Sequence, residues 1–178
     1  MFDSSFSYRL IHEKKIEGKE IVRELIYDFR SSKRRYIVLI EEYQFNVFVP
    51  KFFPSTLKDS PNKFNVLLND FEAPRIVRTC INILLELLVK HSMHSFAFVG
   101  VNTISKETVE QKYFTQRFRI YRQLMLNCFD TANWQHYEDF ATSTYILIPV
   151  AKNNTELYLK EVLKMFSDIY PDLESIDI

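Results

Sequence analysis

Aromatic and β-branched residues dominate the first third of the chain, where apolar positions come in short runs between polar turns. The runs 6–13, 21–29 and 36–43 are of this kind. Segment 21–29 also fits a helical spacing of apolar residues. We favour a strand there, because the polar segment 30–35 followed by the β-branched run 36–43 is typical of a hairpin. The pattern therefore predicts a strand meander at the start of the fold.

A fourth run, YQFNVFVPKFF, alternates well between apolar faces. Pro50 cannot donate a ladder hydrogen bond, which indicates an edge strand or a strand end. An aromatic edge invites strand addition or dimerisation unless other elements cover it. We therefore take Tyr43, Phe45 and Phe48 as candidates for an interaction surface. The alternative, that these rings pack beneath helices, has equal weight at this point.

The rest of the chain alternates helical and strand patterns. Apolar residues at steps of three and four predict helices over 75–91, 114–129 and 154–170. Short apolar runs predict strands over 64–70, 95–101 and 144–150. We expect a single α+β domain over residues 1–178. It would have a mostly antiparallel sheet with an N-terminal meander, then helix–strand–helix–strand–helix, with a parallel insertion where helices cross over.

The composition and charge of the chain argue against several classes of function. The chain has 178 residues, 47% of them hydrophobic, and its 23 basic and 23 acidic residues cancel. A dedicated duplex-DNA protein usually carries a basic excess, which this chain lacks.

The start of the chain has no apolar signal-peptide core, so we expect a cytoplasmic protein. The longest apolar stretch contains a glutamate, so we expect no membrane span. The only glycines, Gly18 and Gly100, form no phosphate-binding loop.

The stretch FTQRFRIYRQLM contains three arginines among aromatics. On a helical wheel, Phe118, Tyr121 and Met125 fall on one face, which predicts a core-facing stripe. Arg119 and Arg122 then face solvent, which is the simpler interpretation. Arg117 lies between the two faces, so that it and Tyr121 could line a cleft where the guanidinium holds a carboxylate or phosphate.

Other basic residues are also candidates for binding a ligand or a nucleic acid. Arg75 and Arg78, at the start of the predicted helix 75–91, are further candidates for binding a small acidic ligand. The turn 30–35 is strongly basic. Nucleic-acid binding would use phosphate contacts from both basic segments. Its candidate residues are Lys33, Arg34, Arg35, Arg119 and Arg122.

The order of meander, long helix, buried strand, helix with a central tyrosine and strand resembles the GNAT acyltransferase fold over residues 20–150. SFAFVGVN followed by TQRFRIYRQLMLNCF is similar to the family's strand and its N-x-x-A-x-x-x-Y helix. The resemblance implies acetyl-CoA as cofactor and Tyr121 as general acid toward the CoA thiolate. Phe114 and Arg117 replace the motif's asparagine and alanine.

The segment where the family's acetyl-CoA loop would lie departs further from the pattern. It reads NDFEAPRIVRT and contains no glycine. Pyrophosphate binding needs free backbone N–H groups at a helix start, and Pro74 removes one. A GNAT-like scaffold would therefore have a degenerate cofactor site.

Metal and nuclease chemistry have weaker support. His91 and His94, with His136, could hold a metal, but no acidic or thiol ligand follows at a suitable spacing. A cationic histidine at a helix C-terminus is the simpler account of His91.

A nuclease site is a separate possibility. Asp28 and Glu86 suggest a sheet that holds two metal ions through carboxylates, but the third carboxylate that such a site needs is missing.

These observations favour a GNAT-like domain that binds without catalysis and without a cofactor. A protein partner or a homodimer is the leading expectation. The alternatives are a divergent acyltransferase that uses acetyl-CoA and Tyr121, and a nucleic-acid-binding protein, which the neutral charge does not favour.

Overall fold

The computed structural model describes residues 5–17, 20–65, 72–100, 110–111 and 113–170. Its strands are β1 (Tyr8–Lys15), β2 (Ile21–Arg30), β3 (Arg35–Tyr43), β4 (Val47–Pro54), β5 (Ser95–Val99), β6 (Trp134–Asp139) and β7 (Thr144–Pro149). Its helices are the 3₁₀ turn η1 (Ser55–Leu57), α1 (Ala73–Lys90), α2 (Gln116–Cys128) and α3 (Thr155–Ile169).

The strands form one seven-stranded sheet in the order β1-β2-β3-β4-β5-β7-β6. The pair β4–β5 is parallel, and α1 forms its crossover connection. The pairs β1–β2, β2–β3, β5–β7 and β6–β7 are antiparallel. The α+β class with a mostly antiparallel sheet is confirmed.

The chain divides into two compact units, and β4 contributes to both. Unit 1 contains residues 1–43 and 49–92, and unit 2 contains residues 44–48 and 93–178. The extent of a single domain over 1–178 stays a prediction.

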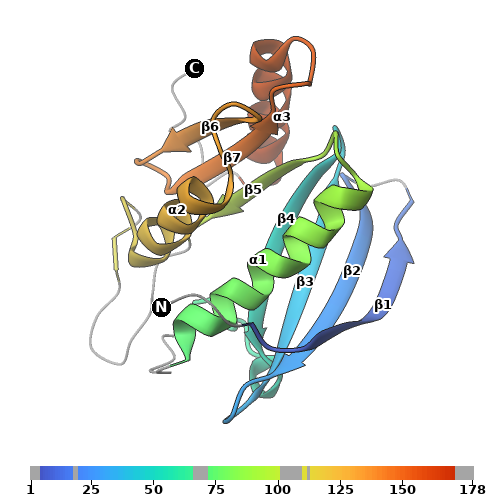
Figure 1. The fold of residues 1–178 in the computed structure, drawn as a ribbon, viewed down its shortest axis with the longest axis vertical. Coiled ribbons are helices and arrows are strands. Elements are labelled where there is room, and N and C mark those ends of the chain that lie inside the picture. Colours follow the sequence, from blue (N-terminus) through green and yellow to red (C-terminus); the bar gives the residue numbers. More distant parts are fainter. Residues whose placement is uncertain (1–4, 18–19, 66–71, 101–109, 112, 171–178) are drawn as a thin grey trace. The chain divides into compact units, whose positions relative to one another are not determined.

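In unit 1, α1 runs across one face of the meander (Figure 1). The β2–β3 register aligns Leu25 with Ile40, Tyr27 with Val38 and Phe29 with Tyr36. All six side chains are buried, because residues two apart on a strand share a face. The strand interpretation of 21–29 is confirmed. The alternation, rather than the helical spacing, describes which side chains are buried.

In unit 2, α2 packs its aromatic stripe against the sheet. Phe118 is fully buried, and its ring lies 6.1 Å from Phe98 and 6.4 Å from Tyr145. Thr115 caps the helix, since its side chain accepts a hydrogen bond from the Phe118 N–H. Gly100 follows β5 and donates its N–H to the Ser143 carbonyl. The core-facing stripe expected for this helix is confirmed for Phe118 and Met125.

Several local expectations were wrong. The strand containing Pro50 is central rather than at an edge, because β4 lies between β3 and β5. Residues 134–139 form β6, which its sequence pattern does not reveal. In the helix predicted over 154–170, the spacing of Leu157, Val162 and Met165 predicts one buried stripe, but Leu157 is 57% exposed. Of the predicted strand 64–70, residues 64–65 form turns and 66–70 lie outside the described residues.

Candidate functional site

The β2–β3 turn contacts the start of α1 in unit 1. The Ser32 N–H and hydroxyl both donate to Glu72 Oε2, at 3.0 and 2.8 Å. Glu72 is the residue that precedes α1. Two segments that are forty positions apart in the sequence therefore meet at one end of the unit.

The chain before β1 reaches the same end. The Arg75 guanidinium lies 3.9 Å from the centre of the Phe6 ring, and Arg75 Nη2 donates to the Ser5 carbonyl at 3.2 Å. Phe6 in turn stacks on Phe29, with ring centroids 5.7 Å apart. A guanidinium over an aromatic face is held electrostatically. The first turn of α1 is thereby fixed against the start of β1.

Asp28 holds two arginines at this end. Its Oδ1 accepts from Arg9 Nε at 2.9 Å, and its Oδ2 accepts from Arg35 Nε at 2.7 Å. The Asp28 side chain is 7% exposed, whereas those of Arg9 and Arg35 are 74% and 38% exposed. The hydrogen bond from Arg9, followed by that from Arg35, lowers the pKa of the Asp28 carboxyl. One buried carboxylate therefore orients two guanidinium groups whose other edges face solvent.

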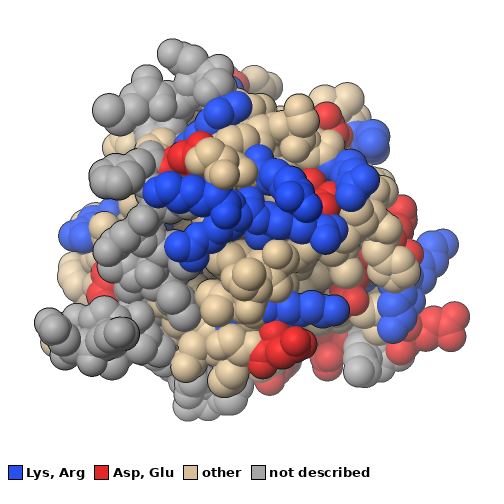
Figure 2. Space-filling model, turned by 90° about the horizontal axis from the view of Figure 1, so that it is seen from below, with Lys and Arg blue, Asp and Glu red and all other residues tan. Residues whose placement is uncertain are grey.

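These contacts place basic residues of several elements at one end of unit 1, which we call the basic end. Its members are Arg9, Arg30, Lys33, Arg34, Arg35 and Arg75. The turn 30–35 and the start of α1 lie at the lower end of unit 1 in Figure 1. Figure 2, the view from below, shows Lys and Arg side chains gathered in a band with few acidic side chains among them. Because arginine predominates, the basic end offers forked donors suited to phosphate or carboxylate.

The structure brings together residues that the sequence placed in separate sites. Lys33, Arg34 and Arg35, taken as nucleic-acid contacts, share the basic end with Arg75, taken as a ligand contact. The binding role of Arg78 stays a prediction. The sequence pattern missed Arg9. It lies opposite Asp28 in the β1–β2 register, and such a pairing becomes visible only once the register is known.

The arginines of α2 belong to unit 2. Arg122 Nε pairs with Glu138 Oε2 at 2.7 Å, and its side chain is 32% exposed. Arg119 is exposed, as expected, with its guanidinium 5.7 Å from the Phe114 ring. Arg117 is half-buried, and its binding role stays a prediction.

Tyr121 lies on the inner side of α2. Its ring meets Phe98 edge-on, with centroids 5.3 Å apart. This T-shaped contact is ordinary aromatic packing. A catalytic role for Tyr121 stays a prediction.

The start of α1 does not suit a pyrophosphate. Glu72 occupies the N-cap position without making a side-chain capping bond, and a proline lies in the first turn. The carboxylate would repel an anion, and the proline offers no N–H to one. The described residues at this helix start therefore do not fit the phosphates of acetyl-CoA.

The interaction surface predicted from β4 is largely absent. Tyr43, at the end of β3, is 1% exposed, and Phe48, in β4, is fully buried. Phe45, in the β3–β4 turn, is 40% exposed. A protein partner or homodimer stays a prediction, but of the three aromatics named for it only Phe45 is available.

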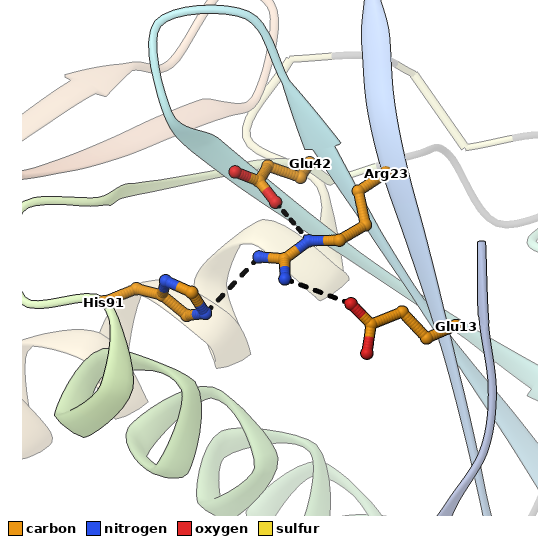
Figure 3. A network of polar contacts seen from close by, with 4 residues as sticks. All are labelled: Glu13, Arg23, Glu42 and His91. Carbon is orange, nitrogen blue, oxygen red and sulfur yellow. Dashed lines mark hydrogen bonds and ion pairs between the residues drawn. The ribbon is translucent and has the colours of Figure 1, made fainter. Parts of the chain in front are cut away.

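His91 belongs to a polar network rather than a metal site (Figure 3). Arg23 donates from Nε to Glu42 at 2.5 Å and from Nη1 to Glu13 at 3.2 Å, and its Nη2 lies 3.3 Å from His91 Nε2. The charge state of His91 at the helix end stays a prediction. Within the described residues, no group of His, Cys, Asp and Glu could hold a metal ion.

His136 lies in unit 2. Its Nδ1 hydrogen-bonds the Tyr145 hydroxyl, and its Nε2 is buried without a partner among the described residues. Tyr145 is 1% exposed, and its burial raises its pKa above the ordinary value. Tyr145 is therefore enclosed by the core, whereas the His136 side chain is half-buried.

No family model matches the chain, and no curated protein or solved structure matches it. Among the described helices, none is both long and apolar enough to cross a membrane. The cytoplasmic location stays a prediction.

Proposed function

We propose that this protein is a non-catalytic binding domain on a GNAT-like α+β scaffold, and that the basic end binds the phosphate backbone of a nucleic acid. The observation that carries the proposal is the convergence of cations from β1, the β2–β3 turn and the first turns of α1. The carboxylates of Asp28 and Glu72 lie among these cations. Such a local patch can bind phosphates although the chain as a whole is neutral.

Two features favour a nucleic acid over an apolar protein partner. Arg30, at the end of β2, and Lys33 and Arg34, on the β2–β3 turn, are exposed, so that they can follow an extended backbone. The aromatic surface that would have favoured protein contact is mostly buried. The guanidinium groups of Arg9 and Arg35 are also already oriented by Asp28, so less side-chain entropy is lost on binding.

The test is salt-dependent binding of a fluorescent single-stranded and a duplex oligonucleotide. The double variant Lys33→Gln, Arg34→Gln is expected to bind about tenfold more weakly at low salt, because each phosphate contact contributes to counterion release. The slope of log affinity against log salt should fall by about one for each contact removed. Both residues lie on an exposed turn, so folding should be unaffected.

The matched control is Lys160→Gln, Lys164→Gln, which removes the same charge from exposed positions on α3. Equal weakening by both variants would mean that only net charge matters, and the basic end would be rejected as the site. Equal binding of polyglutamate and of the oligonucleotide would point instead to an acidic protein partner.

A divergent acyltransferase is the second candidate. Its support is the order of a meander (β1–β4), a long helix (α1), a buried strand (β5) and a helix with a central tyrosine (α2), on which the GNAT resemblance rests. In this function Tyr121 would be the general acid and acetyl-CoA the cofactor. The unsuitable helix start at Glu72 argues against it.

Thermal stability with and without millimolar acetyl-CoA distinguishes the two functions. A ligand that binds only the folded state raises the melting temperature in step with its concentration. We expect no dose-dependent shift. A dose-dependent rise would favour the acyltransferase, and Tyr121→Phe should then abolish acetyl transfer while keeping the shift.

A further inference from the structure

Strand β3 of unit 1 buries one of its two faces much more deeply than the other. Tyr36, Val38 and Ile40 alternate along the strand and are at most 1% exposed. Ile37 and Leu39 lie between them and are only half-buried. Because successive side chains of a strand point to opposite faces, the two sets mark the two sides of the sheet.

Helix α1 covers the deeply buried side. Phe29 belongs to this side, because it lies opposite Tyr36 in the β2–β3 register. Phe6 stacks on Phe29 with ring centroids 5.7 Å apart, and its N–H donates to Thr79 Oγ1 of α1 at 2.9 Å. The half-buried residues of β3 therefore lie on the side of the sheet away from α1, which we call the outer face.

The strand register shows which residues share the outer face, since residues opposite each other in an antiparallel pair point to the same side. They form three rows: Arg30 with Arg35, then Arg9 with Asp28 and Ile37, and then His12 with Ile26 and Leu39. The first two rows contain arginines of the basic end. The basic end therefore adjoins an apolar strip on the same side of the sheet, which consists of Ile26, Ile37 and Leu39.

Positive charge is in excess only in the first two of these rows, where three arginines surround Asp28. The row beyond the apolar strip is balanced, because Lys14 lies opposite Glu24 and Lys51 pairs with Glu41 at 2.6 Å. Phosphates are therefore expected at the arginines. From Arg35 to Leu39 the strand runs about 13 Å, and sheets that bind single-stranded RNA hold two or three bases on such a face.

We propose that the apolar strip binds unpaired bases, so that the nucleic acid bound by this protein is single-stranded. This inference rests on the proposed function, because phosphates held at the basic end would place the bases over the strip. Unstacked bases have apolar faces that pack against side chains, including the imidazole of a histidine such as His12. In a duplex these base faces are stacked on one another and cannot reach the sheet.

The first experiment compares two probes on the unchanged protein. One is a fluorescent thymidine strand of about 12 nucleotides, and the other is an abasic strand of the same length and charge. The abasic strand should bind about tenfold more weakly, because it keeps the phosphates and lacks the bases. Equal affinity would overturn the single-strand inference and leave phosphate binding at the basic end intact. Failure of both probes to bind would reject the proposed function together with it.

A second experiment makes the same substitution on the two sides of the sheet. Leu39→Thr should weaken binding of the thymidine strand about fivefold without changing the salt slope, since no phosphate contact is removed. Binding of a duplex should not change. The matched control is Leu10→Thr, because Leu10 is 45% exposed and lies opposite Tyr27 on the side that α1 covers. Threonine suits a strand at both positions. Equal weakening by the two variants would overturn the assignment of the bases to the outer face.

Discussion

Replacing Phe48 with alanine is expected to destabilise the protein by about 3–5 kcal/mol, the usual cost of truncating a buried aromatic side chain. Phe48 is fully buried, and its ring stacks against His94 at 4.6 Å and Phe96 at 5.9 Å. Its backbone pairs with Phe96 in the parallel β4–β5 ladder. Truncation would leave a cavity where β4 enters the core of unit 2.

Urea unfolding followed by the fluorescence of Trp134, the only tryptophan and part of the same unit, measures this loss. The matched control is Phe45→Ala, three residues earlier and 40% exposed. It should change the free energy of unfolding by about 0.5 kcal/mol or less, as surface substitutions usually do. Similar small effects of both variants would support the edge-strand interpretation and contradict the central position of β4.

Replacing Gly100 with alanine is expected to cost about 1–3 kcal/mol, because the added methyl group overpacks a tight site. An ideal Cβ at Gly100 would lie 2.6 Å from Thr115 Oγ1, 2.7 Å from Phe118 Cβ and 2.8 Å from Phe118 N. Thr115 Oγ1 also donates to the Gly100 carbonyl at 2.7 Å. The methyl group would therefore push the start of α2 away from the end of β5.

The same urea assay with Trp134 fluorescence applies, with loss of helical circular dichroism as a second signal. Thr115→Ser is the control, because it keeps the hydroxyl that caps α2 and bonds Gly100. It should cost less than about 1 kcal/mol. If Gly100→Ala left stability unchanged, the close approach between Gly100 and Phe118 would be wrong.

The sequence was informative wherever local periodicity reflects burial. Residues 75–91 predict a helix because Ile76, Ile83, Leu84 and Leu87 recur at helical spacing, and these residues form the buried face of α1. The runs 36–43 and 95–101 predict strands for the same reason. The α+β class follows from the order of these elements, so it needs no long-range information.

The surface sites depended on information that local patterns do not contain. Residues 134–139 form β6 because they pair with β7, although their own sequence does not alternate. Arg9 joins the candidate site through the register between two strands. A strand's register and neighbours are set by contacts between distant residues.

The sequence by itself determined the fold class, most helices and strands, and the absence of glycine-rich phosphate loops. Only the tertiary structure decided that β4 is central and that Phe48 is core. It also decided that Arg34 and Arg75 share one end of unit 1, through the contact of Ser32 with Glu72. The physical reason is that burial periodicity is local, whereas strand order and charge clustering arise from segments that meet only on folding.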